Sequence, residues 1–330
     1  MSNSLYKIVL AGILLLSIGR SFAQEKRAQT GFQFLSVVPD ARSAALAGAV
    51  TTVAQKSSAL WDNPATMSEM SKEFDAAFSM NRWIADINHN AFSLAYRPNN
   101  GLLGVFALSF LYVDYGTIEG TIFAQNEQGY LETGDILPNA YALGFGYARN
   151  LTNRFNVGGQ VKLVHQNLGP ALVKLTAQED VIKQDKNSLS VLAFDFGTTY
   201  RTGYKSFVFG MSIRNFSQEI KYVAENFQLP LTFSIGASMD LFDFIEAPRQ
   251  TLLLTVDAIH PRSHKEQVKI ATEYTYRKML ALRFGYVSGA DEQNLSFGFG
   301  IKSMGIGLDY AYTPFGIFTK VQRISIRFSL

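Results

Sequence analysis

Four histidines are the residues best suited to acid–base chemistry in this chain of 330 residues. They are His89, His165, His260 and His264. Asp86 stands near the first of them, and Asp257 stands near His260. A hydrolase needs a nucleophile or an activated water within reach of an oriented histidine, and neither pair provides one in sequence. We therefore predict that the chain is not an enzyme and has no catalytic residue.

Metal and cofactor chemistry is equally unsupported. The chain has no cysteine, which excludes disulfides and thiolate ligands. It also contains no acidic calcium loop and no phosphate loop of useful spacing. We expect no cofactor and no metal site. The net charge of the whole chain is only +3, and the sequence contains no basic tract. Both observations argue against nucleic acid as a partner.

Charged residues of both signs fall at alternate positions of predicted strands, on the face opposite the large apolar side chains. The candidates are Lys162, Asp195, Arg214, Glu273, Arg283, Asp309, Arg323 and Arg327. In an open aqueous pore such residues would set ion selectivity. Alternatively, they pair across a lumen and hold a plug. We favour pairing because the mixed signs leave no strong field for a permeating ion.

The elements that carry these residues alternate apolar and polar side chains with a period of two, which indicates β-strands. About fourteen strands are expected, each near the length of a tilted membrane crossing. They lie near 74–84, 90–98, 102–115, 139–150, 154–168, 188–201, 204–214, 229–241, 250–260, 267–277, 279–288, 294–302, 305–313 and 321–330.

The last strand alternates up to its final residue, Leu330. An apolar strand with an open edge invites aggregation, whereas closure into a membrane barrel removes that edge. Short turns also alternate with long loops at 116–138, 169–187 and 215–228, as in outer-membrane barrels. A soluble β-sandwich would instead expose a charge-rich face. We predict an all-β transmembrane antiparallel barrel, with both termini in the periplasm.

The N-terminus is typical of a secretory signal, with Lys7, an apolar core and a small-residue cleavage site at Ala23. Its apolar core is too short for a membrane-spanning helix. We therefore expect a signal peptide at 1–23, an N-terminal plug segment at 24–72 and the barrel at 73–330. Removing Lys7 and Arg20, the only charges of the signal, lowers the net charge from +3 to +1.

Residues 31–70 interrupt the strand pattern. Asp40 can cap a helix that runs from Ala41 toward Val53, and Asn63 with Pro64 can begin a second one. These helices form either a periplasmic linker or a plug inside the lumen. We favour the plug because a barrel of this size leaves space that side chains alone do not fill. We expect Arg42 to pair with one of the lumen acids.

Two stretches resemble the N-terminal signature of the PorV/PorQ family. Residues 34–45 are FLSVVPDARSAA, and residues 59–65 are ALWDNPA. The motif residues are Pro39, Asp40, Ala41, Arg42, Trp61, Asn63, Pro64 and Ala65. The segments at 137–141 and 146–151 resemble the same family's mid-barrel strand, although Ala140 stands where the family often has an acid.

This resemblance implies a FadL-like barrel in the outer membrane of a Bacteroidetes-type bacterium, acting in type IX protein secretion. The implied partners are the type IX translocon pore, secreted cargo proteins and membrane lipid, with lipopolysaccharide or a hydrophobic ligand as further candidates. The rival hypothesis is a FadL-like transporter of hydrophobic small molecules. Apolar loop residues such as Ile118, Phe123 and Leu131 would line its pocket.

Overall fold

The computed structural model describes residues 30–174, 182–221, 226–245, 247–290, 293–316 and 318–330. The predicted signal peptide at 1–23 lies outside these residues. Fourteen antiparallel strands close into one barrel, in which β1 pairs with both β2 and β18. The predicted fold class is therefore confirmed.

The barrel strands follow the alternating segments of the sequence closely. They are β1 (Phe74–Arg82), β2 (Asn88–Tyr96), β3 (Val105–Asp114), β6 (Asn139–Asn150), β7 (Phe155–Lys174), β8 (Ile182–Arg201), β9 (Val208–Phe216), β12 (Thr232–Asp240), β13 (Gln250–Pro261), β14 (Gln267–Tyr276), β15 (Leu280–Ser288), β16 (Leu295–Ser303), β17 (Ile306–Phe315) and β18 (Phe318–Ser329).

Alternation along each strand separates an apolar outer face from a buried inner one. In β1, Phe78 and Met80 are more than 40% exposed, whereas Asp75, Ala77 and Ser79 are buried. The exposed apolar side chains recur around the whole barrel. Because only a bilayer stabilises such a surface, this face meets lipid.

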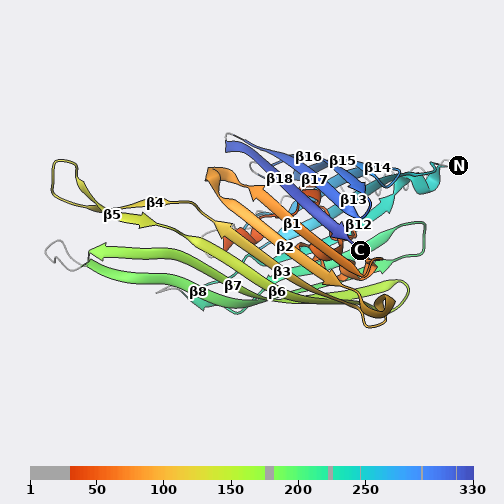
Figure 1. The fold of residues 1–330 in the computed structure, drawn as a ribbon, viewed down its shortest axis with the longest axis horizontal. Helices are drawn as coiled ribbons and strands as arrows, with labels where there is room; N and C mark the ends of the chain where they lie inside the picture. The colour runs from red at the N-terminus through yellow and green to blue at the C-terminus, as the bar shows by residue number, and fades with distance from the viewer. Residues whose placement is uncertain (1–29, 175–181, 222–225, 246, 291–292, 317) are drawn as a thin grey trace, which may run out of the picture.

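The barrel has two different ends. At the short-turn end, where β14 turns into β15 and β16 into β17, the backbone of Phe74 also bonds that of Leu330 and so joins the first strand to the last. At the opposite, long-loop end, the β7–β8 hairpin and a second hairpin extend far beyond the other strands (Figure 1). The second hairpin consists of β4 (Ile118–Phe123) and β5 (Tyr130–Ile136).

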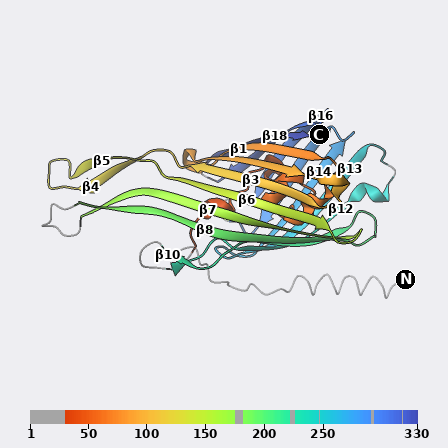
Figure 2. The same cartoon turned by 60° about the horizontal axis from the view of Figure 1, so that its bottom comes forward.

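Each of the three predicted long loops therefore contains strand residues. The predicted loop 116–138 contains the β4–β5 hairpin, and the predicted loop 169–187 is partly occupied by the ends of β7 and β8. Figure 2 shows both hairpins from a second direction. The third loop, 215–228, contains a two-stranded sheet of β10 (Ile220–Lys221) and β11 (Asn226–Phe227).

Residues 30–70 lie inside the barrel as short helical turns (Figure 1). They are η2 (Gln33–Ser36), α2 (Ala41–Ala45), η3 (Lys56–Trp61) and η4 (Pro64–Glu69), and η5 (Ile84–Asp86), η6 (Pro98–Gly101) and η7 (Leu241–Phe244) lie in other connections. The predicted helix from Ala41 toward Val53 is too long, because the backbone turns at Ala47 and Gly48, whose φ angles are 54° and 72°. Among the described residues, no helix has the length and apolar character to cross a bilayer.

Candidate plug–barrel site

A four-residue ion network joins α2 to the inner wall. Glu273 of β14 accepts two bonds from Arg42, at 2.7 and 2.8 Å, and one from Arg283 of β15 at 2.5 Å. Arg283 also donates to Asp309 of β17 at 2.7 Å. Burial alone would lower the pKa of Arg42, but the charge and hydrogen bonds of Glu273 outweigh burial and raise that pKa. The pair therefore stays ionised, and the expected partner of Arg42 is Glu273.

A second network joins η3 to the closing strands. Arg327 of β18 donates to Asp75 of β1 at 2.9 Å and to Ser58 at 2.8 Å, and it lies 3.5 Å from Asp40. Asp75 also accepts from the backbone and hydroxyl of Ser57. Asp40 caps α2 through the amide of Ser43, as the sequence predicted. The sequence analysis did not identify Asp75. Its position as a lone acid on the inward face of the first strand could have indicated it.

Arg214 and Lys162 occupy the side of the lumen formed by β7, β8 and β9. Arg214 donates to the carbonyl of Trp61 at 2.6 Å and lies 3.7 Å from Asp62. Lys162 pairs with Asp195 at 2.8 Å. The Lys162–Asp195 pair joins two strands of the wall, whereas Arg214 contacts the plug.

The Asn63-Pro64-Ala65 element begins η4 as predicted. The Asn63 side chain accepts from the amide of Ala65 at 3.0 Å and donates to the carbonyl of Thr51 at 2.6 Å. Pro64 occupies the first turn, where a missing amide proton costs nothing. One buried asparagine thus begins a helical turn and ties it to the preceding segment.

Inward glycines allow the plug to approach the wall. A Cβ on Gly158 of β7 would lie 2.5 Å from the backbone of Pro64, and one on Gly285 of β15 would lie 2.6 Å from that of Ala47. Real Cβ atoms do not come so close. Gly158 and Gly285 are therefore plug-contact positions, since any side chain there would push the plug away.

Arg323 of β18 occupies a different kind of site. It donates to the carbonyl of Val38 at 2.9 Å and lies over the ring of Trp83, but it pairs with no acid among the described residues. Its neighbours along the ladder are Asn81 and, beyond it, His89. Both are buried, and within the described chain their side-chain polar atoms lack hydrogen-bond partners. No sequence pattern indicated this row of polar side chains.

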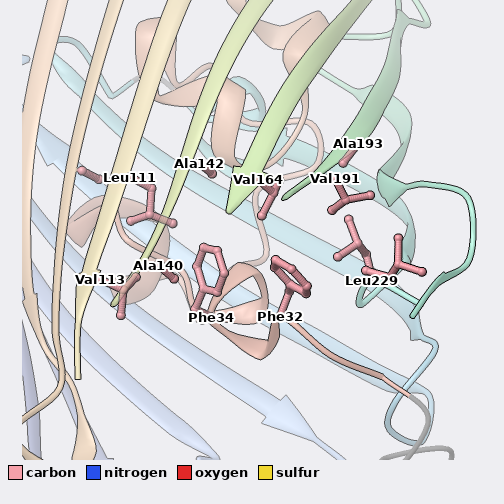
Figure 3. Packing of buried hydrophobic residues seen from close by; sticks show 12 residues of the cluster. Phe32, Phe34, Leu111, Val113, Ala140, Ala142, Val164, Val191, Ala193 and Leu229 are labelled. Carbon is pink, nitrogen blue, oxygen red and sulfur yellow. The ribbon is translucent and has the colours of Figure 1, made fainter. Parts of the chain in front are cut away.

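Near the long-loop end, apolar contacts also hold the plug against the inner wall. Phe32 and Phe34 project from the plug toward Leu111, Val164 and Val191 of the inner wall (Figure 3). Beside them is a cavity of about 480 Å³. Its lining includes Phe32, Phe34, Trp83, Ile87, His89, Leu168 and Phe227.

The predicted site residues thus fall into two groups. Six of the eight lumen charges contact the plug or form its ion network with Arg42, while Lys162 and Asp195 pair with each other. Asp257, the acid nearest to His260 in the sequence, is buried, whereas His260 is exposed and lies 3.2 Å from Glu266 of the following loop. The arrangement is suited to holding a plug in place.

Comparisons with known proteins give two findings. A family model described as "Type IX secretion system membrane protein PorP/SprF" matches residues 113–316, more than half of the chain. No curated protein matches. Among solved structures, the CymD monoaromatic hydrocarbon channel is similar with a TM-score of 0.61 and 15% identity, covering 90% of this chain and 98% of that one.

Two further structures have the same fold. The toluene transporter TodX of Pseudomonas putida gives a TM-score of 0.54 at 14% identity, covering 82% of this chain and 91% of that one. A FadL homologue of Pseudomonas aeruginosa gives 0.53 at 11% identity, covering 88% and 98%. Identities this low establish the shared barrel fold and nothing more.

Proposed function

Because the chain belongs to the PorP/SprF family of type IX secretion system membrane proteins, we propose that it is a non-enzymatic outer-membrane component of that system, which docks to the translocon pore and to secreted cargo. The family match is the observation that carries this proposal. In it, the short-turn end and both termini face the periplasm, and the long loops face outward.

The plug supports a docking role over a channel role. Ion pairs of Arg42 with Glu273, of Arg214 with Asp62 and of Arg327 with Asp40 hold it against three different parts of the wall. A solute pathway would have to displace these buried pairs, each of which is costly to break. We therefore propose that the lumen is closed and that the protein acts through its surfaces.

The projecting hairpins are the surfaces we assign to cargo or translocon contact. Phe123 is 77% exposed at the end of β4, and Ile118 and Leu131 are more than half exposed. Exposed apolar side chains on a projecting hairpin mark an interaction surface. The PorV/PorQ motifs around Asp40 and Asn63 lie outside the matched residues 113–316, so we keep a PorV/PorQ-type docking role within the proposal.

Co-purification in mild detergent tests this function. The full-length protein should isolate with a much larger barrel or with secreted cargo. Serine replacements at Ile118, Phe123 and Leu131 should remove that partner while the barrel remains assembled. A control with serine at exposed Met304, at the short-turn end, should retain it. Wild-type protein that isolates with bound lipid and no protein partner would reject the secretion role.

The cavity beside Phe34 favours a second candidate, binding of hydrophobic small molecules. Its aromatic lining and its volume of about 480 Å³ suit a small apolar ligand. Mass spectrometry of organic extracts from the purified protein tests this candidate. Recovery of an apolar ligand that Phe34→Asp abolishes would support it, and an empty extract from the wild type would count against it.

A further inference from the structure

A second cavity lies at the short-turn end, between the plug and the inner wall of β14 to β18. Its volume is about 300 Å³. Three small residues, Ala281, Gly300 and Gly307, line its wall. They occupy inward positions, whereas Ile301, which also lines the cavity, and its strand neighbour Ile306 are about half exposed. The cavity therefore lies between the plug and the barrel wall, and Leu280 and Ile301 belong to its rim at the end of the barrel.

The lining is strongly cationic. It contains six basic side chains and two acids: Arg42, Lys56, Lys278, Arg283, Lys302 and Arg327, with Glu273 and Asp309. The two acids pair with arginines, and Asp75 pairs with both Lys56 and Arg327. Even if Asp40 and Asp75 are added to the lining acids, the cations exceed the acids by two.

Lys278 and Lys302 account for that excess. Both are exposed at the end of the barrel, and neither forms an ion pair with any residue that the structure describes. The neighbouring Arg42, Lys56, Arg283 and Arg327 are all paired. The charges of Arg42, Lys56, Arg283 and Arg327 are thus neutralised by acids. The ammonium groups of Lys278 and Lys302, at the end of the barrel, are available to a ligand.

Gln55 adds a further donor to the same lining. It is 1% exposed, and its Nε2 has no acceptor among the described residues. Buried amide groups nearly always have partners, so an unpartnered one calls for an explanation. Together with two free ammonium groups, this donor makes the cavity complementary to an anion.

We infer that this cavity binds a carboxylate of an acidic protein segment that enters from the short-turn end. A lipid head group is disfavoured because the inner part of the lining, Arg42, Gln55 and Lys56, belongs to the plug inside the ring of strands. Its small volume suits one or two acidic side chains. The anion site stands on the geometry alone, whereas the assignment of the acidic segment to a protein of the secretion machinery rests on the proposed function.

Fluorescence anisotropy with a labelled oligoglutamate peptide tests the site. The full-length protein is placed in discs of neutral lipid at low ionic strength, where exposed charge pairs are least screened. Lys278→Gln and Lys302→Gln should each weaken binding about threefold, and the double variant about tenfold. Lys72→Gln, an exposed lysine that does not line the cavity, is the matched control and should bind as the wild type does.

Three outcomes would overturn the inference. The double variant binds as tightly as the wild type, an oligoglutamine peptide binds as well as oligoglutamate, or inorganic phosphate displaces the peptide at lower concentrations than free glutamate does. Cargo export in bacteria carrying the double variant is measured separately. Export that persists when peptide binding is lost would leave the anion site standing and reject only its role in secretion.

Discussion

Replacing Glu273 by glutamine should release the plug from the barrel wall. The carboxylate accepts three hydrogen bonds, two from Arg42 and one from Arg283. Glutamine removes the negative charge, and its amide NH₂ faces Arg42 in either orientation because Arg42 bonds both carboxylate oxygens. Asp309 still compensates Arg283, but Arg42 keeps only the carbonyl of Ala54 and a weak contact with Gln55.

The free-energy cost of the Glu273→Gln change follows from the burial of the Arg42–Glu273 pair. Breaking a buried ion pair by removing one partner costs about 3–5 kcal/mol. The side chain of Glu273 is 9% exposed and that of Arg42 is 21% exposed, so the lower value, about 3 kcal/mol, applies. Because about 1.4 kcal/mol changes an equilibrium tenfold, the released state of the plug should become about a hundredfold more populated.

Tryptophan fluorescence can follow this release, since the chain has two tryptophans, Trp61 in the plug and Trp83 after β1. In a Trp83→Phe background, urea titration should show a plug transition at lower urea for Glu273→Gln, while circular dichroism reports the intact barrel. Glu266→Gln, an acid about half exposed on a loop, is the matched control. Equal midpoints for Glu273→Gln and Glu266→Gln would refute the reasoning.

Three further changes test other contacts. Gly158→Val should unseat η4, because its Cβ would lie 2.5 Å from Pro64, whereas Gly159→Val, whose Cβ meets nothing closer than 3.4 Å, should leave Trp61 fluorescence unchanged. Asn63→Ala should destabilise the seated plug by about 1–2 kcal/mol in the same urea titration, as expected for a lost cap; no shift would contradict the capping role. Deleting residues 324–330 removes the β18 partners of Asp75 to Met80 in β1 and should prevent barrel closure, seen as loss of heat-modifiable migration in gels. Deleting Leu330 alone should be tolerated.

The barrel could be predicted from the sequence because its inner and outer faces have opposite requirements. Membrane strands such as β15 and β18 must place apolar side chains outward at every second residue, and this period of two can be detected in the amino-acid sequence. The projecting β4–β5 hairpin obeys no such rule, since both of its faces are largely exposed. Its strands therefore left no period to detect.

The plug was harder to predict because its shape depends on distant residues. Its alanines favour a helix to Val53, yet the chain turns after Ala45 where Ala47 must approach Gly285 across the lumen. The Arg42 contact was predictable from charge alone, but its partner Glu273 lies 231 residues away. The row of Asn81, His89 and Arg323 exists only once β1, β2 and β18 are paired.

The plug contacts join residues that are far apart in the sequence, and this separation sets the order in which the plug and the barrel assemble. The amide of Ala41 bonds Ser325, 284 residues later in the chain, so the start of α2 cannot complete its contacts before the last strand is made. Contacts this far apart in sequence form late. Until β18 pairs with β1, the barrel interior that buries residues such as Leu46 and Leu60 is incomplete, and these side chains need shielding from water. Seating of the plug therefore reports that the barrel has closed, and an incompletely assembled chain is recognisable by its unburied N-terminal segment.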